Sequence, residues 1–138
     1  MVLADSNVLL DIIKCDPLWL PWSRFAPTNA LLNGRVFVNP LIYAELSITY
    51  QTSAQLDQIL NLLDIERAEL PWEAAHLAGQ AFIQYKRRGG NKTSPLPDFY
   101  IGAHAQVAGF TLLTRDVNRF RTYFPNVCLL TPENHPIY

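Results

Sequence analysis

The sequence lacks the features of a membrane or secreted protein. No apolar run in its 138 residues approaches the roughly 20 residues that a membrane-spanning helix needs. The first sixteen residues contain three aspartates and one basic residue, Lys14, which is the wrong charge balance for a signal peptide. Only two cysteines occur, Cys15 and Cys128, both beside apolar residues, so we expect reduced, buried thiols. These absences predict a cytoplasmic protein.

Several common functional motifs are also missing. No spacing of cysteine and histidine suggests a zinc site, and no glycine-rich loop suggests a nucleotide cradle. The three histidines, His76, His104 and His135, have no obvious relay partner in the sequence. His104 lies in an alanine-rich segment, which favours packing over catalysis. The acidic residues are therefore the main candidates for chemistry.

The composition is that of one folded domain spanning residues 1–138. Apolar residues make up 49% of the chain, and a chain of this length buries roughly 68–70% of its unfolded surface. Strands are expected at residues 2–4, 35–38, within 65–70, at 110–114 and at 127–130. Helices are expected directly after Asp5, within 17–34, at 41–50, after Thr52, at 71–88, 98–108 and 117–123. In the second of these helices, Pro27 interrupts the apolar pattern and allows a broken helix.

The order of these elements predicts the fold class. Strands alternate with helices, and each strand is brief and apolar instead of alternating in polarity, as in a parallel sheet covered on both faces. We therefore expect an α/β protein with three layers, in which helices flank a short, mostly parallel central sheet.

Two aspartates occupy equivalent positions at the ends of expected strands. Asp5 directly follows the apolar run 2–4, and Asp116 follows the run 110–114. Parallel strands bind ligands at their carboxyl ends, so the two side chains are expected to converge. Asp116 could instead cap the helix that follows it. This coincidence is the strongest positional signal in the sequence.

Two further acids lie on apolar helix faces. Glu45 belongs to a helix that is apolar nearly all round, and a buried glutamate needs a cation, a salt bridge to an arginine or a solvated gap. Asp98 stands at helical spacing with Ile101, Gly102 and Ala105, so its carboxylate begins the buried stripe. Alternatively, Asp98 could be an acid in the first turn of the helix, where the helix dipole favours negative charge.

Four carboxylates in one place would require a cation. Asp5, Glu45, Asp98 and Asp116 would repel one another strongly if nothing lay between them. Ligands that are all oxygen select a hard metal, so Mg²⁺ is expected, with Mn²⁺ able to substitute.

The charge balance agrees with a polyanionic substrate. The net charge is −1, but setting aside four of the 12 acidic residues leaves 8 against 11 basic ones. Two basic clusters stand out. They are Lys86, Arg87, Arg88 and Lys92, and Arg115, Arg119 and Arg121. A metal-filled acidic hollow beside basic clusters suits a nucleic acid. Solvated helix ends are the alternative reading of these clusters.

Four segments together resemble the PIN domain, and more closely the VapC-type toxin ribonucleases of bacterial toxin–antitoxin pairs. The segments are Asp5-Ser-Asn-Val-Leu-Leu-Asp11, Val38-Asn-Pro-Leu-Ile-Tyr-Ala-Glu45-Leu, Pro97-Asp98-Phe-Tyr-Ile-Gly-Ala-His-Ala105 and Leu112-Leu-Thr-Arg-Asp116-Val-Asn-Arg-Phe-Arg-Thr-Tyr-Phe-Pro125. Each is weak alone, but four in order at these separations cover the chain nearly end to end. Ser6 stands where threonine is common in the family, and both carry a hydroxyl.

The resemblance implies a PIN-like three-layer fold and metal-dependent hydrolysis of RNA phosphodiesters. Asp5, Glu45, Asp98 and Asp116 would be the catalytic quartet. In this interpretation Asp5, Asp98 and Asp116 hold the metal, and Ser6, Asn7 and Thr114 support them. The resemblance also implies a homodimer and a small antitoxin whose basic segment inserts at the acidic site.

The residues that would contact RNA are less well defined. Arg115, Arg119, Lys86, Arg87 and Arg88 are candidates for contacts to the RNA backbone. Two alternative functions remain open: a non-catalytic PIN-like module whose acidic pocket binds a basic partner peptide, and a phosphatase or DNA nuclease that uses the same acids.

Overall fold

The centre of the fold is a five-stranded parallel sheet, seen in a computed structural model that describes residues 1–137. The strands are β1 (Val2–Ala4), β2 (Val36–Val38), β3 (Ile65–Arg67), β4 (Thr111–Leu113) and β5 (Leu129–Leu130). They lie in the order β3-β2-β1-β4-β5, and every pair is parallel. Since chain order reverses on either side of β1, this strand stands at the position where parallel sheets bind ligands.

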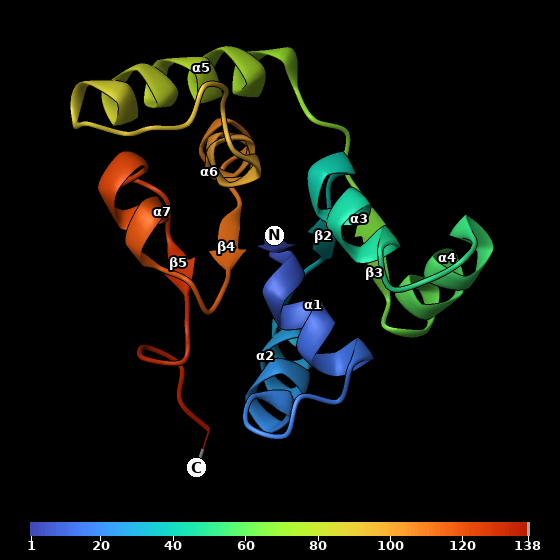
Figure 1. Ribbon diagram of the computed structural model, residues 1–138. Coiled ribbons are helices and arrows are strands. Elements are labelled where there is room, and N and C mark those ends of the chain that lie inside the picture. The colour runs from blue at the N-terminus through green and yellow to red at the C-terminus, as the bar shows by residue number, and fades with distance from the viewer. Residues whose placement is uncertain (138) are drawn as a thin grey trace.

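Seven helices cover the sheet within the described residues. They are α1 (Ser6–Ile13), α2 (Leu20–Asn33), α3 (Pro40–Ser47), α4 (Ser53–Leu62), α5 (Trp72–Arg87), α6 (Pro97–Ala108) and α7 (Asn118–Tyr123). Figure 1 shows α5 and α6 on one side of the row of strands and α1 and α2 on the other. The expected three-layer α/β fold is therefore confirmed. None of the described helices is long and apolar enough to cross a membrane.

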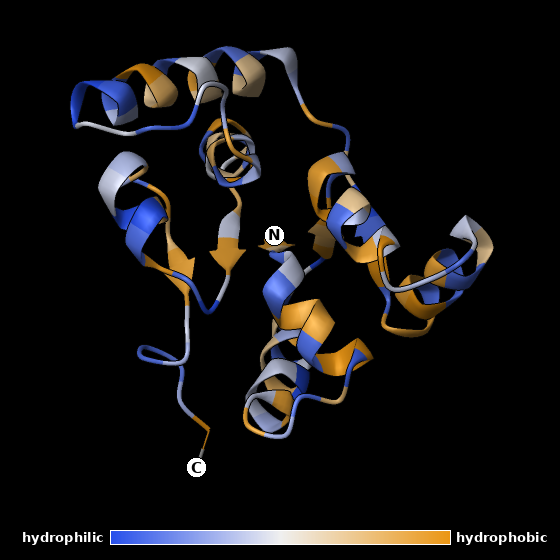
Figure 2. Cartoon of the chain, in the orientation of Figure 1, coloured by the Kyte–Doolittle hydropathy of each residue, from blue (hydrophilic) through white to orange (hydrophobic). Residues whose placement is uncertain are grey.

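The strands are apolar because both of their faces are covered. Residues Val36–Val38 of β2 are all buried, and Leu3 and Ala4 of β1 are fully buried. Figure 2 shows the strands mainly in the hydrophobic colour, whereas the start of α1 and the loop after β4 are hydrophilic. Polar groups thus collect where strands end.

Capping residues begin and end the helices at the expected places. The Asn39 side chain accepts a hydrogen bond from Ile42 N at 2.9 Å, which fixes the start of α3. Thr52 forms a capping box with Gln55 at the start of α4. Gly109 ends α6 with a φ of 70°, a left-handed conformation that glycine adopts without strain.

Pro27 does not break α2. The helix runs from Leu20 to Asn33 through the proline, so the possible break does not occur. Proline removes one backbone hydrogen bond. Pro27 is itself buried on the same face as Trp22, Ala26 and Ala30, and this packing offsets the loss.

The expectation that both thiols are buried is wrong. Cys15 and Cys128 are free and exposed. Cys15 follows the C-terminal end of α1 in a turn with a φ of 52°, where its side chain faces solvent. Cys128 immediately precedes β5, an edge strand, where alternate side chains point away from the core.

His104 links the two helices that carry Glu45 and Asp98. Its side chain is 1% exposed, as the alanine-rich segment predicts, and its Nδ1 lies 3.1 Å from the amide nitrogen of Asn39. Asn39 therefore caps α3 with its oxygen and contacts α6 with its nitrogen. Burial lowers the pKa of His104, so the ring stays neutral and Nδ1 can accept the hydrogen bond.

Gly102 allows α6 to pack against Phe124. A Cβ atom at this position would lie 2.3 Å from Cδ2 of Phe124, a side chain that is 1% exposed. We expect Gly102→Ala to lower the free energy of unfolding by about 1–3 kcal/mol, as overpacked cores do. This loss should appear although alanine is the better helix former by about 1 kcal/mol. Urea denaturation measures it.

Gly79 provides the matched control for this substitution. It lies within α5, and a Cβ added there would meet no atom within 4 Å. Gly79→Ala is expected to raise the free energy of unfolding by about 0.4–1 kcal/mol, because it only restricts the unfolded chain. A Gly102→Ala protein as stable as the Gly79→Ala protein would contradict the predicted clash.

Candidate active site

Asp5 lies at the carboxyl end of the central strand and is only 4% exposed. Its Oδ1 accepts a hydrogen bond from Ser6 N at 2.8 Å, and its Oδ2 accepts one from the Thr114 hydroxyl at 2.9 Å. Burial raises its pKa to about 7, partly opposed by the Thr114 hydrogen bond. The charges of Asp98 and Glu45 add to the increase. Asp5 is therefore a buried acid without a compensating cation.

Two side chains join Asp5 to the loop that follows β4. Thr114 Oγ1 accepts hydrogen bonds from Asn7 Nδ2 at 3.2 Å and from Asp116 N at 3.1 Å. The side-chain oxygen Oδ1 of Asn7 accepts a hydrogen bond from Arg115 N at 3.3 Å. Thr114 is fully buried, so this web fixes the backbone on either side of Arg115 against the start of α1.

Glu45 projects from α3 with one oxygen that has no partner. Its Oε1 is buried and makes no hydrogen bond within the described residues. Burial raises the pKa of Glu45, the Ser6 hydrogen bond opposes the increase, and the charge of Asp98 adds to it. No ion pair within residues 1–137 involves Glu45, so the arginine salt bridge considered for it is not formed there.

Asp98 stands in the first turn of α6, where it is half-buried. Burial raises its pKa, Arg119 opposes this, and Asp116 adds to it. Arg119 Nη1 lies 3.7 Å from Asp98 Oδ2. The N-cap of α6 is Leu96, so Asp98 does not cap the helix through its side chain.

Asp116 is exposed in the loop after β4. No side chain caps α7, so the alternative role of Asp116 as its helix cap is not formed. Asp116 and Asp98 share the wall of a hollow of about 470 Å³. Asn118, Arg119, Thr122 and Tyr123 complete this lining. The hollow thus has carboxylates, a guanidinium group and an aromatic ring.

The four carboxylates are electrostatic neighbours, but they are not drawn together as ligands around one point. Among residues 1–137, no three acidic, histidine or cysteine side chains are grouped closely enough to hold a metal ion. Arg119 holds Asp98 instead. The donor set still suits a hard cation, because the unpartnered Oε1 of Glu45 and the raised pKa of Asp5 both mark negative charge without compensation.

The predicted RNA-contacting residues differ in their surroundings. Lys86, Arg87 and Arg88 are exposed at the C-terminal end of α5, and the Arg88 guanidinium lies 5.5 Å from the centre of the Tyr123 ring. Tyr123 lines the hollow, so Arg88 is next to its wall. Arg119 is part of the lining of the same hollow. Arg115 is half-buried and paired with Asp11 at 2.7 Å.

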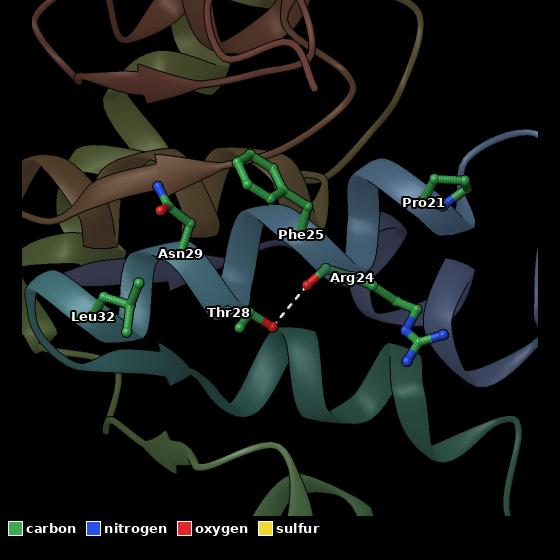
Figure 3. Close-up of a pocket in the computed structure, with 6 residues that line it drawn as sticks. All are labelled: Pro21, Arg24, Phe25, Thr28, Asn29 and Leu32. Atoms are coloured by element: carbon green, nitrogen blue, oxygen red, sulfur yellow. Dashed lines mark hydrogen bonds between the residues drawn. The ribbon is translucent and has the colours of Figure 1, made fainter. Parts of the chain in front are cut away.

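A second hollow, of about 490 Å³, lies along α2 and is separate from these acids. Figure 3 shows its lining, which consists of Pro21, Arg24, Phe25, Thr28, Asn29 and Leu32. All six residues come from one helix, and the Thr28 hydroxyl donates to the backbone oxygen of Arg24 at 2.8 Å. This hollow contains one arginine and no carboxylate, so its lining could not hold a hard metal ion through acidic side chains.

Asp11 is a buried acid that the sequence analysis does not single out. It is 4% exposed within α1, among apolar residues. The argument applied to Glu45, that a carboxylate on an apolar helix needs a partner, would have found it. Its partners are Ser23, at 2.6 Å from Oδ2, and Arg115.

Comparison with known proteins gives a match to one domain family and to several solved structures. The sequence profile of the PIN domain matches residues 2–124. The chain is similar to the structure of VapBC2 from Rickettsia felis bound to a DNA fragment from its promoter, and to that of VapBC-1 from nontypeable Haemophilus influenzae. For each, identity is 20%, the TM-score is 0.70, and the match covers 95% of this chain and 98% of the other.

A toxin–antitoxin complex from Klebsiella pneumoniae is also similar, with 20% identity, a TM-score of 0.66, and coverage of 96% of this chain and 98% of the other. No protein of curated function matches the chain closely enough to count as a relative. At these identities the similar structures establish the fold.

Proposed function

This chain belongs to the PIN domain family, and from that premise we propose that it is a metal-dependent endoribonuclease. The observation that carries the proposal is the arrangement of Asp5, Glu45, Asp98 and Asp116, which influence one another electrostatically although they come from four separate segments. Burying or crowding carboxylates costs stability, so a protein keeps such a group when a cation or a reaction uses it.

In the proposed enzyme Asp5, Asp98 and Asp116 would hold Mg²⁺, or Mn²⁺ in its place. When bound, such an ion supplies positive charge beside the scissile phosphate and makes a water molecule more acidic. The Thr114 hydroxyl donates to Asp5 and so orients its carboxylate, and the Ser6 side chain favours the charged form of Glu45. Glu45 keeps its Oε1 free of protein hydrogen bonds, which leaves that atom able to orient the attacking water.

The proposed reaction is an in-line hydrolysis. The water oxygen forms a bond to phosphorus while its proton passes to Glu45, whose pKa is raised by burial and which is therefore a better base. The bond from phosphorus to the 3′-oxygen of the preceding nucleotide breaks, and that oxygen takes a proton from solvent. The products carry a 5′-phosphate and a 3′-hydroxyl.

RNA is the proposed substrate because the hollow beside Asp98 and Asp116 contains groups that bind a single strand. Arg119 can contact a phosphate, and Tyr123 presents an aromatic ring to a base. Lys86, Arg87 and Arg88 extend the positive charge along α5. Contacts of this kind hold the backbone without reading its sequence.

We also propose that the chain is the toxin of a toxin–antitoxin pair and acts as a homodimer in the cytoplasm. The similar structure from Klebsiella pneumoniae is a toxin–antitoxin complex. The acidic hollow suits a basic segment of an antitoxin, since Asp98 already accepts a cationic side chain from Arg119 within this chain. Such a segment would exclude the metal and RNA together.

Incubation of the purified protein with total RNA, with and without EDTA, tests the proposal. Cleavage should occur with Mg²⁺ and disappear with EDTA, because carboxylates without the cation leave the phosphate charge unopposed. The released fragments should carry 5′-phosphates, which sequencing of the ends detects. Intact RNA under all metal conditions would contradict the proposed activity.

The same assay separates the alternative functions. The pairing of Asp98 with Arg119 favours one of them, a non-catalytic module that captures a basic peptide. That module would bind a lysine- and arginine-rich peptide but leave RNA intact. Cleavage of DNA, or of a simple phosphate monoester, in preference to RNA would instead identify a DNA nuclease or a phosphatase.

A further inference from the structure

A buried ion pair connects α1 to the loop that carries Asp116. Arg115 Nε lies 2.7 Å from Asp11 Oδ2, and its Nη2 lies 3.0 Å from Oδ1, so the pair is bidentate. The Ser23 hydroxyl donates to the same Oδ2 at 2.6 Å. The guanidinium also stacks on Trp19, 4.8 Å from the ring centre. Residues of α1, α2 and the loop after β4 thus meet at this ion pair.

The burial of this pair distinguishes it from a surface salt bridge. The side chain of Asp11 is 5% exposed and that of Arg115 is 25% exposed. Arg35 and Glu66 form another bidentate pair, at 2.8 and 2.5 Å, but their side chains are 60% and 45% exposed. Exposed pairs contribute little, whereas breaking a buried pair leaves an uncompensated charge.

The residues on either side of Arg115 belong to the acidic site. Thr114 donates to Asp5, and the amide of Asp116 donates back to Thr114. The amide of Arg115 donates to Asn7, two residues after Asp5. The backbone from Thr114 to Asp116 is therefore attached to α1 and Asp5 by short polar contacts, and the pair of Arg115 with Asp11 is the only salt bridge among the described contacts of that segment.

We propose that Arg115 is a positioning residue, which holds Asp116 and Thr114 in register with Asp5 through its ion pair to Asp11. The expected effect on RNA cleavage rests on the proposed nuclease function. The expected effect on the order of the backbone from Thr114 to Asp116 does not. The guanidinium donates from Nε and Nη2 to Asp11, and its face stacks on Trp19. In the free protein these groups are therefore engaged within the chain and are not available to bind RNA.

Arg115→Gln tests the role, because glutamine keeps an aliphatic stem with a polar end group but loses the positive charge and the bidentate pair with Asp11. Hydrogen exchange at the amides of Arg115 and Asp116 should become at least about tenfold faster. These amides donate to the side chains of Asn7 and Thr114, and the ion pair holds the loop that carries them. The affinity for Mn²⁺, followed by calorimetry, and kcat for RNA should each fall about 10–100-fold. KM for RNA should stay within about twofold. Arg115→Lys should recover part of each loss.

The double variant Asp11→Asn with Arg115→Gln covers the case in which the single variant does not fold, because it removes both charges of the pair and leaves neither partner buried alone. It should show the same faster exchange. Arg35→Gln breaks the matched exposed pair and should leave exchange at both amides, Mn²⁺ affinity and activity unchanged.

The outcomes separate the two proposals. Unchanged exchange at Arg115 and Asp116 in folded variants would overturn the positioning role. A raised KM with unchanged Mn²⁺ affinity and exchange would also overturn it, and would assign Arg115 to RNA contact. Faster exchange in a protein whose wild type cleaves no RNA would support the positioning role and remove the nuclease proposal.

Discussion

Asp98→Asn is expected to lower RNA cleavage by about 100-fold or more. The substitution keeps the size of the side chain and removes its charge, so the proposed cation would lose a ligand. Arg119 also loses its partner at 3.7 Å and is free to turn toward solvent. The rate of cleavage of a labelled RNA under single-turnover conditions, at saturating Mg²⁺, measures the effect.

Glu73→Gln is the matched control for Asp98→Asn. Glu73 is an exposed acid at the second position of α5, the same helix position that Asp98 has in α6. Both substitutions remove a favourable interaction with a helix dipole, worth about 0.3–1 kcal/mol. Cleavage by Glu73→Gln should be unchanged. Near-normal turnover by Asp98→Asn would leave Asp98 with only the helix role.

Asp5→Asn is expected to stabilise the metal-free protein at neutral pH. Asparagine can keep the contact with Ser6 N, which its oxygen can accept, and the Thr114 hydroxyl can still donate to the backbone oxygen of Asp116 at 3.2 Å. The cost of burying a charged carboxylate at this position disappears, and so does the repulsion that Asp98 and Glu45 exert on it. At pH 8 the gain in the free energy of unfolding should be on the order of 4 kcal/mol, from a pKa of 3.8 in the unfolded chain and about 7 in the folded one.

The pH dependence has a defined sign. Between pH 3.8 and about 7, folded Asp5 keeps a proton that the unfolded chain has lost, so its contribution to stability falls as pH rises. His104 acts in the opposite direction, because its lowered pKa makes the folded state less stable as pH falls below 6.5. Both proteins contain His104, so the difference between them isolates Asp5. That difference should grow from pH 4 to pH 7 and then level off.

Urea denaturation in EDTA at several pH values provides the measurement. Asp64→Asn, at an exposed position, should change stability by less than about 0.5 kcal/mol throughout. Adding Mg²⁺ at 100 times its dissociation constant should stabilise the wild type by about 2.7 kcal/mol, and should stabilise Asp5→Asn much less. A difference that does not vary with pH, or a melting temperature indifferent to Mg²⁺, would contradict the burial of an uncompensated charge at Asp5.

Much of the fold could be predicted from the sequence because local signals agree with it. The cap at Asn39 and the turn at Gly109 mark helix ends through their own backbone and side-chain chemistry. The last strand is shorter than expected, since residues 127–130 are all apolar but only Leu129–Leu130 pair with β4. Pro27 was uncertain because burial in the assembled fold, which the sequence does not state, decides whether its helix continues.

The sequence marks the candidate carboxylates one by one, but it does not show the contacts that each of them makes. Asp5 and Asp116 are marked by their places after strands, and Glu45 by its apolar helix. The pair of Asp11 with Arg115 joins residues 104 apart in the chain, and no local pattern encodes it. The hold of Arg119 on Asp98 is likewise a tertiary contact between α6 and α7.

The central place of β1 sets when the site can form during synthesis. Thr114 is 109 residues away from Asp5, the residue to which it donates. Contacts of such long sequence separation are slow to form, and a ribosome releases the chain from its N-terminus first. The segments that carry Asp5 and Glu45 are synthesised before β4. Asp5 therefore cannot form its hydrogen bond with Thr114 until β4 and the loop after it have been translated.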